Sequence, residues 1–192
     1  EVDQAIVDSS QPRHYMLTYL HRIAELLRSK RKEAGAIILE QPEMSLRITP
    51  PGKITVNVIP RSTPARQMVS EFMILCNSLL AEFSRSQGFP TTYRSQVAPD
   101  IKDEVKDLPN GPLRRYMIMR RFPPADLDLT PAPHGALGVP IYIHVTSPLR
   151  RYPDLMMQRQ ITHFLNTGHA LYSANTMASL AHRAEIQLRE LS

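Results

Sequence analysis

The chain has 192 residues, of which 42% are hydrophobic and 21% are charged, so it can bury a core and is not expected to be disordered. No stretch approaches the roughly 20 consecutive apolar residues of a membrane helix, and the acidic start lacks a signal-peptide layout, which favours a cytoplasmic protein with no membrane partner. The net charge of +5 favours a polyanionic partner, because clustered Lys and Arg attract phosphate, but charge alone does not identify nucleic acid.

The first part of the chain is predicted to form a helix followed by short strands. Residues 11–34 carry apolar side chains at helical spacing and end in a basic turn before Gly35. Turn signals that contain proline or glycine then separate three apolar runs, at residues 36–39, 46–49 and 54–59. These runs predict an antiparallel meander.

A second long helix is predicted over residues 64–86, where apolar side chains form one stripe. The lone cysteine, Cys76, lies in this run. It is expected to be a small buried residue rather than a nucleophile or a metal ligand, and a disulfide within the chain is excluded.

The second half of the chain begins with loops and ends in helices. Five of the 17 prolines fall in residues 123–140, which therefore predict a loop that leads into a strand at residues 141–145. Helices resume at Ser147 and continue to the C-terminus, with a break at Gly168. These elements indicate the α+β class, with an antiparallel meander packed on several long helices.

The segment 142–154 combines features that suit a bound phosphate. An apolar strand passes directly into a predicted helix start, with Ser147 as N-cap and Pro148 at the first helical position. Such a start directs free backbone N–H groups and a positive dipole end at one point. Arg150 and Arg151 lie in the same turn, so the segment predicts a phosphate site.

Local physics alone leaves a second interpretation open for this segment. Asp154 follows Arg150 by four residues and could hold its guanidinium in place, but a plain ion pair on a helix surface fits the spacing equally well. A capped surface helix with two solvated arginines is then as compatible with the sequence as a phosphate site.

A wider pattern surrounds this segment. Residues 133–142 read Pro-His-Gly-Ala-Leu-Gly-Val-Pro-Ile-Tyr and residues 146–152 read Thr-Ser-Pro-Leu-Arg-Arg-Tyr, followed by Asp154 and Arg159. Upstream, in order, lie the basic run Arg31-Lys-Glu-Ala-Gly35, the run Glu71-Phe-Met-Ile-Leu-Cys-Asn77 and the run Phe89-Pro-Thr-Thr-Tyr-Arg94. Together they closely resemble, over nearly the whole chain, the ribonuclease II-type (RNB) exoribonuclease family.

The resemblance implies both a domain and a reaction. Residues 1–192 would be the C-terminal portion of one RNB catalytic domain, whose N-terminal half and flanking OB-fold domains are absent from this sequence. The family hydrolyses single-stranded RNA from its 3′ end to nucleoside 5′-monophosphates, and DNA is not expected as a physiological substrate. The implied cofactor is Mg²⁺, or Mn²⁺, bound mainly by aspartates of the missing half. That remaining part of the same domain would be the protein partner of this chain, and single-stranded RNA would be its ligand.

The resemblance also assigns roles to residues. Arg150 matches the arginine that stabilises charge on the reacting phosphate, and Glu71 matches a carboxylate that contacts RNA sugar hydroxyls, although it could be an ordinary helix carboxylate. The other RNA-binding candidates are Arg94, Thr146, Ser147, Arg151 and Tyr152. His134 also matches but is expected to be a packing residue. Gln158 stands where the family usually has histidine, which favours a structural role there.

No metal site is predicted within the chain itself. The two dense acidic groups, residues 100–107 and 126–128, read as a solvated helix face and as part of a proline-rich loop. Two alternatives to the exoribonuclease remain open. One is a catalytically inactive RNB-like RNA-binding regulator, and the other is a basic helical module for protein partners.

Overall fold

The computed structural model describes residues 1–39, 43–50, 52–59, 63–101, 105, 107–109 and 111–190, and divides into two compact units. The first unit comprises Glu1–Lys30 and Ile38–Met73. The second comprises Arg31–Ile37 and Ile74–Ser192. The α+β class is confirmed, since long helices accompany two separate pairs of short antiparallel strands.

The first unit holds helices and one hairpin: α1 (Val2–Val7), α2 (His14–Glu33), β1 (Glu43–Thr49), β2 (Lys53–Ile59) and the start of α3 (Pro64–Gln87). The Asp3 carboxylate accepts the backbone N–H of Ala65 at 2.6 Å, which satisfies one of the free donors in the first turn of α3. Both long helices lie close to their predicted ranges, because each combines strong helix formers with a clear apolar stripe.

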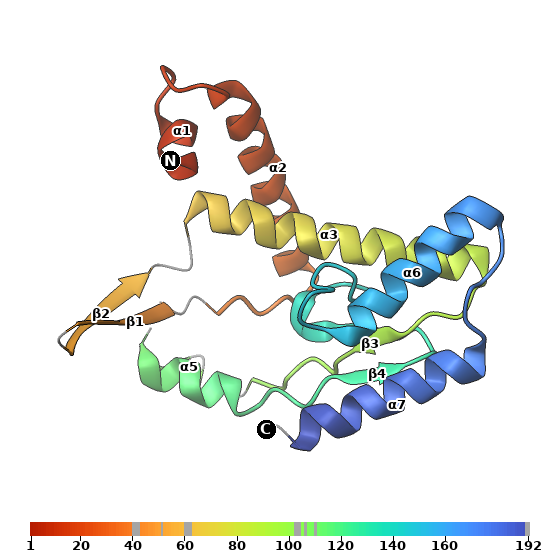
Figure 1. Cartoon of the computed structure of the whole chain (residues 1–192). Helices are drawn as coiled ribbons and strands as arrows, with labels where there is room; N and C mark the ends of the chain where they lie inside the picture. The colour runs from red at the N-terminus through yellow and green to blue at the C-terminus, as the bar shows by residue number, and fades with distance from the viewer. Residues whose placement is uncertain are drawn as a thin grey trace. The chain divides into compact units, whose positions relative to one another are not determined.

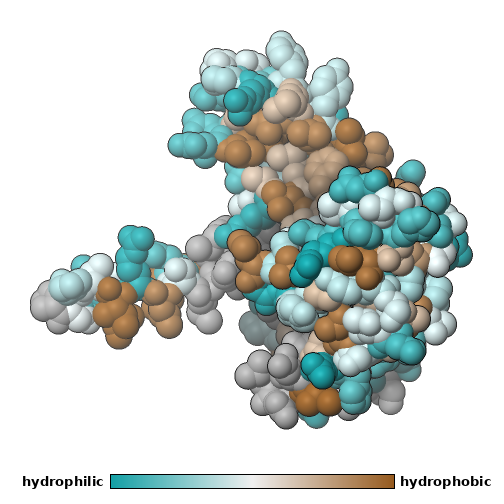
Figure 2. Space-filling model, turned by 45° about the vertical axis from the view of Figure 1, so that its right-hand side comes forward, coloured by the Kyte–Doolittle hydropathy of each residue, from teal (hydrophilic) through white to brown (hydrophobic). Residues whose placement is uncertain are grey.

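The hairpin presents an unpaired apolar face. Its register pairs Leu46 with Val56 and Ile48 with Ile54, and alternation along each strand puts these four side chains on the same face. All four are more than half exposed in the described structure. The space-filling view shows hydrophobic residues along one side of the hairpin (Figure 2).

The predicted three-stranded meander is wrong in one strand. Residues 36–39 have no strand assignment, and only the runs at 46–49 and 54–59 form β1 and β2. The backbone N–H of Ile37 instead donates to the carbonyl of Ala136 at 3.1 Å. An isolated hydrogen bond of this kind holds the segment extended without building a ladder.

The second unit packs two helices on a small two-stranded sheet. Its elements are the end of α3, β3 (Tyr93–Ser95), α5 (Pro112–Met119), β4 (Asp126–Asp128), η1 (Gly135–Leu137), α6 (Tyr152–Thr167) and α7 (Ala174–Glu190). β3 and β4 pair antiparallel, and α7 lies along β4 (Figure 1). This arrangement brings segments far apart in the sequence together at one end of the sheet.

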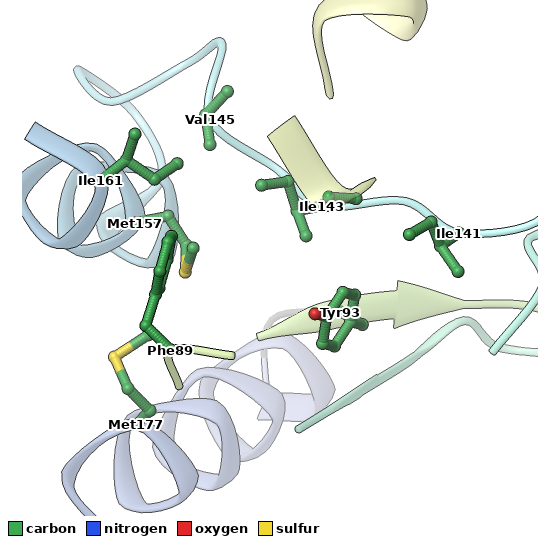
Figure 3. Close-up of a cluster of buried hydrophobic side chains, with 9 residues drawn as sticks. Phe89, Tyr93, Ile141, Ile143, Val145, Met157, Ile161 and Met177 are labelled. Atoms are coloured by element: carbon green, nitrogen blue, oxygen red, sulfur yellow. The ribbon is translucent and has the colours of Figure 1, made fainter. Parts of the chain in front are cut away.

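A single apolar cluster holds this unit together (Figure 3). Phe89, Ile143, Met157 and Met177 come from a loop, an extended segment, α6 and α7, and all are at least nine-tenths buried. Burying an aliphatic or aromatic side chain of this size contributes about 1.5–3 kcal/mol. The cluster therefore fixes the positions of α6 and α7 against the β3 segment.

Two further sequence predictions are corrected in this unit. Residues 141–145 form only an isolated bridge between Tyr93 and Ile143, together with a hydrogen bond from the Arg94 N–H to the Tyr142 carbonyl, because β3 is only three residues long and offers little backbone to pair with. Cys76 is exposed rather than buried, since the apolar stripe of α3 places it on the outer face.

Candidate functional site

The arginine pair lies on a tight turn in front of a helix rather than inside the helix. The backbone N–H groups of Arg150 and Arg151 both donate to the carbonyl of Ser147, at 3.3 and 3.0 Å. Arg151 is extended, with φ −131° and ψ 109°, and α6 begins only at Tyr152, with Pro153 in its first turn. The predicted helix start at Ser147 is therefore wrong.

The reason for this difference is a buried carboxylate. Asp154 has no exposed surface, and its Oδ2 accepts the backbone N–H of Ser147 at 2.9 Å and Nη2 of Arg151 at 2.7 Å. The side chain thus closes the turn from the helix side. It also corrects the predicted pairing, because Asp154 holds the guanidinium of Arg151 and not that of Arg150.

Arg150 itself projects from the turn. Its side chain is exposed, and its Nη2 donates a long hydrogen bond of 3.4 Å to the Ser147 hydroxyl. The backbone that carries it is held at both ends, by the Ser147 carbonyl and by Asp154. A cation on a fixed backbone with a solvent-facing guanidinium is suited to contact an anionic ligand.

The turn forms one side of a pocket of about 550 Å³. The pocket is lined by Thr92, Arg94, Leu127, His144, Arg150, Arg151, Tyr152, Pro153, Asp154, Leu180, Arg183 and Ala184. Four arginines face a single carboxylate, which gives a formal charge of +3. The apolar residues of the lining come from β4, α6 and α7, so the pocket combines a basic wall with an apolar one.

The histidine of this pocket has a lowered pKa, first because it is buried and then because positive charges lie near it. Burial, together with the charges of Arg151, Arg94, His134 and Arg150, lowers the pKa of His144 to about 3. Burial and the charge of Arg94 lower the pKa of His134 to about 4. Both imidazoles are therefore neutral at pH 7, and the positive charge of the site comes from guanidinium groups.

Two buried side-chain amides, to which the sequence assigned no role, hold backbone segments next to the site in place. Asn77, 1% exposed, donates to the hydroxyl of Tyr142 at 2.8 Å and accepts the backbone N–H of Val145 at 3.2 Å. Gln160 donates to the carbonyl of Pro90 at 2.8 Å and accepts the N–H of Tyr172 at 2.8 Å. A buried polar side chain at helical spacing among apolar residues is the signal that could have identified them.

The structure brings most of the predicted site residues together. Arg94, Arg150, Arg151 and Tyr152 all line the pocket, although they come from β3, the turn and α6. Thr146 and Ser147 lie in the same segment, separated from the arginines by two residues, and are half-buried.

Several residues singled out in the sequence lie outside the pocket lining. The Thr146 hydroxyl accepts a long hydrogen bond from Asn77, at 3.4 Å. Gln158 donates to the carbonyl of Val145 at 2.6 Å, in line with its predicted structural role. His134 is buried with its ring edge-on to that of Tyr142. Glu71 is buried on α3 in the first unit, whereas the pocket belongs to the second unit.

Among the described residues no group of three or more His, Cys, Asp and Glu side chains could hold a metal ion. Asp126 and Asp128 are exposed on β4, and Asp128 accepts the backbone N–H of Thr130 at 2.7 Å. Of the other acidic group, Asp103 and Glu104 lie outside the described residues.

Among the helices of the described residues, none is long and apolar enough to cross a membrane.

Comparison with known sequences gives matches along most of the chain. The family model of the RNB domain matches residues 1–167. An uncharacterised ribonuclease of Synechocystis sp. is 34% identical over 136 residues, which covers 70% of this chain and 20% of the relative. The chloroplastic/mitochondrial ribonuclease II of Arabidopsis thaliana is 32% identical over 220 aligned positions, covering 100% of this chain and 27% of the relative. The chain thus spans about a quarter of the length of these relatives.

Solved structures with a similar fold include both an enzyme and a pseudonuclease. An active-site mutant of the Dss1 exoribonuclease from Candida glabrata superposes with a TM-score of 0.77 at 26% identity, over 92% of this chain and 25% of that chain. Yeast Ssd1, a pseudonuclease, superposes with a TM-score of 0.62 at 15% identity, over 96% of this chain and 27% of that chain. The second likeness shows the fold alone.

Proposed function

Because the chain belongs to the RNB domain family, we propose that it forms the C-terminal portion of the catalytic domain of a 3′–5′ exoribonuclease. The intact protein would hydrolyse single-stranded RNA, not DNA, and release nucleoside 5′-monophosphates. The observation that carries this proposal is the pocket into which Arg94, Arg150 and Arg151 converge beside the exposed ring of Tyr152.

In the proposed reaction Arg150 acts on the scissile phosphate. Negative charge grows on the phosphate oxygens as the phosphodiester is hydrolysed, and a guanidinium can bridge two of these oxygens with its planar fork. Arg150 combines an exposed side chain with a backbone fixed by the Ser147 carbonyl. A donor fixed in place before the reaction is typically worth about 10²-fold or more in rate.

Arg151 is assigned a different role from its neighbour. Its Nη2 is held by Asp154 at 2.7 Å, so its charge is largely matched within the protein. We assign to Arg151 and Arg94 the binding of RNA backbone rather than the reacting phosphate. Tyr152, 58% exposed at the pocket, offers a ring on which an unpaired base can stack, an interaction worth about 1–3 kcal/mol in single-strand binding.

The divalent metal is proposed to be bound by residues beyond this chain. The described residues provide no carboxylate cluster, so they do not fit a Mg²⁺ or Mn²⁺ site by themselves. The chain supplied alone is therefore expected to be inactive on RNA. Glu71 stays a prediction as a contact to ribose hydroxyls, the feature by which RNA is distinguished from DNA.

A second candidate function is an RNA-binding protein without catalysis. The similarity in fold to the pseudonuclease Ssd1 favours it, because the same architecture occurs without nuclease activity. The pocket described above would then bind RNA in the same way, and the difference would lie in the residues that hold the metal.

The experiment that separates these two functions is a degradation assay. The intact protein is incubated with Mg²⁺ and single-stranded RNA, labelled at its 5′ end to follow product length and labelled uniformly to identify the released nucleotides by thin-layer chromatography. The enzyme is expected to shorten the RNA progressively from its 3′ end, to release 5′-mononucleotides and to stop when the metal is chelated. Binding of RNA with no release of nucleotides would favour the regulator, and the absence of both would contradict the proposed function.

A further inference from the structure

One wall of the pocket comes from a helix beyond the part of the chain that the family model matches. The match ends at residue 167, whereas α7 begins at Ala174. Leu180, Arg183 and Ala184 of α7 nevertheless line the pocket together with the arginine turn. The α7 wall, meaning these three residues, is therefore a part of the site that the family pattern does not account for.

The packing of α7 determines which of its residues reach the pocket. Met177 and Ala181 are 1% and 5% exposed and anchor the helix in the second unit. Leu180, three residues after Met177, also packs against the apolar cluster. Residues three and four apart share a helix face, so Arg183 and Ala184 continue the line of Leu180 past the edge of the core. The anchored helix thus presents Arg183 at the pocket.

The charge of Arg183 is not matched from within the described structure. Among the described residues none forms a hydrogen bond or an ion pair with its side chain, whereas Arg151 is paired with Asp154. Arg183 therefore adds a cation to a pocket that already holds three arginines and one carboxylate. Gathering like charges is unfavourable unless a ligand of the opposite charge binds among them.

A single phosphodiester group would leave most of this charge unmatched. It carries one negative charge, against the formal charge of +3 in the pocket. The volume of about 550 Å³ also lies within the range of sites that enclose a small organic ligand, and so is larger than one phosphate requires. Both the charge and the space suit a ligand with successive phosphates.

We propose that the α7 wall is a second phosphate-binding position, in which Arg183 binds the RNA phosphate next to the one contacted by Arg150. Leu180 and Ala184 contact the sugar or base between the two phosphates. This inference rests on the proposed function, since it takes RNA as the ligand. Arg183 binds substrate here and has no part in the chemical step.

The test uses the intact protein with Arg183→Ala and Arg183→Lys. Arg120→Ala is the matched control, because Arg120 is an exposed arginine of the same unit that lies outside the pocket lining and contacts Tyr116. Affinity for single-stranded RNA is measured with the metal withheld, over a series of salt concentrations. Turnover is measured separately, with Mg²⁺ and saturating RNA.

Loss of one phosphate contact predicts three results for Arg183→Ala. The affinity falls by about tenfold, as for the loss of a charge-assisted hydrogen bond. The slope of log affinity against log salt becomes shallower by about 0.7, the value for one phosphate of a single strand. Turnover at saturating RNA stays at the wild-type value. Arg183→Lys keeps the salt slope, and Arg120→Ala changes neither quantity.

Short ligands identify the phosphate concerned. A trinucleoside diphosphate has two phosphates and a dinucleoside monophosphate has one, so Arg183→Ala should weaken binding of the first and leave the second unchanged. Inorganic phosphate serves as the probe for a site that binds any anion. Equal weakening for both nucleotides and for inorganic phosphate would overturn the assignment to an adjacent RNA phosphate.

The remaining outcomes separate this inference from the proposed function. If Arg183→Ala leaves affinity and salt slope unchanged while Arg150→Ala loses turnover, the second phosphate position is wrong and the proposed function stands. If Arg183→Ala lowers turnover at saturating RNA as much as Arg150→Ala does, Arg183 acts on the reacting phosphate and the inference is overturned. If neither arginine affects RNA binding or turnover, the proposed function itself fails.

Discussion

The buried carboxylate of Asp154 offers the sharpest prediction about how the site is held together. Asp154→Ala removes the acceptor for both the Ser147 N–H at 2.9 Å and the Arg151 guanidinium at 2.7 Å. Removing one partner of a buried ion pair costs about 3–5 kcal/mol, because the other charge stays behind without compensation.

The structure places this variant at the lower end of that range. The Arg151 side chain is 27% exposed, so water can solvate part of its charge once the carboxylate is gone. Asp154 Oδ1 and Arg151 Nε are also buried without a hydrogen-bond partner among the described residues, and this reduces the stability that the native pair contributes. We expect Asp154→Ala to lower the free energy of unfolding by about 3 kcal/mol.

A milder replacement isolates the contribution of charge. Asp154→Asn keeps an oxygen that can accept the Ser147 N–H, but it exchanges a charged acceptor for a neutral one. Hydrogen bonds to charged groups contribute about 1.5–3 kcal/mol and neutral ones about 0.5–1.5 kcal/mol, so a loss of about 1–2 kcal/mol is expected.

The assay is urea unfolding of the intact protein, with Asp154→Ala measured in the wild-type and in the Arg151→Ala background. The double-mutant cycle should give a coupling of about 2 kcal/mol, since most of the cost comes from the unpaired guanidinium. A loss below about 1 kcal/mol for Asp154→Ala, or the same loss in both backgrounds, would refute the assigned role of this pair.

Three further predictions follow from the packing and the titrating groups. Gly138→Ala should strongly lower the melting temperature, because φ at this position is +66° and the added Cβ would lie 2.5 Å from the carbonyl oxygen of Arg31. A wild-type melting temperature for this variant would contradict the prediction. In the folded state the pKa of His144 is lowered to about 3 and that of His134 to about 4. Between pH 6.5 and 4, therefore, only the unfolded state binds protons at these two histidines. The free energy of unfolding should be full above pH 6.5 and should fall as the pH drops through this window. His144→Gln should flatten that dependence, measured as urea midpoints against pH. The isolated chain should self-associate in light scattering through the apolar face of the β1–β2 hairpin, and Leu46→Ser should reduce the effect; a monodisperse wild-type chain would refute this.

The sequence predicted regular elements well where one periodicity dominates. The helix predicted over residues 64–86 is α3 (Pro64–Gln87), because its apolar stripe is continuous and Gly88 adopts a φ of +71° just past its end. The runs at 46–49 and 54–59 lie within the paired strands β1 and β2, which extend over residues 43–49 and 53–59. Residues 36–39 show the limit, since a short apolar run does not reveal whether a neighbouring strand is available to pair with it.

Part of the pocket lining was predictable from the sequence, but the contacts that hold it together were not. Resemblance identified Arg150 and Arg151, yet the helix start was placed at Ser147 because Ser-Pro is a common beginning of a helix. The choice between that start and the observed one depends on Asp154, whose carboxylate reaches back to Ser147. Arg183 was not identified because it enters the pocket only through the packing of α7 on the core, a long-range effect that no local pattern encodes.

The most direct test of the central claim compares Arg150→Ala and Arg150→Lys with Arg151→Ala in the intact protein. Single-turnover cleavage is measured with saturating RNA and Mg²⁺, and RNA binding is measured with the metal withheld. If Arg150 acts on the reacting phosphate, Arg150→Ala lowers the cleavage rate by about 10² or more with far less effect on binding, and lysine rescues it poorly. Arg151→Ala should instead weaken binding and make its salt dependence shallower, with near-normal cleavage. Cleavage by Arg150→Ala at the wild-type rate would contradict the account.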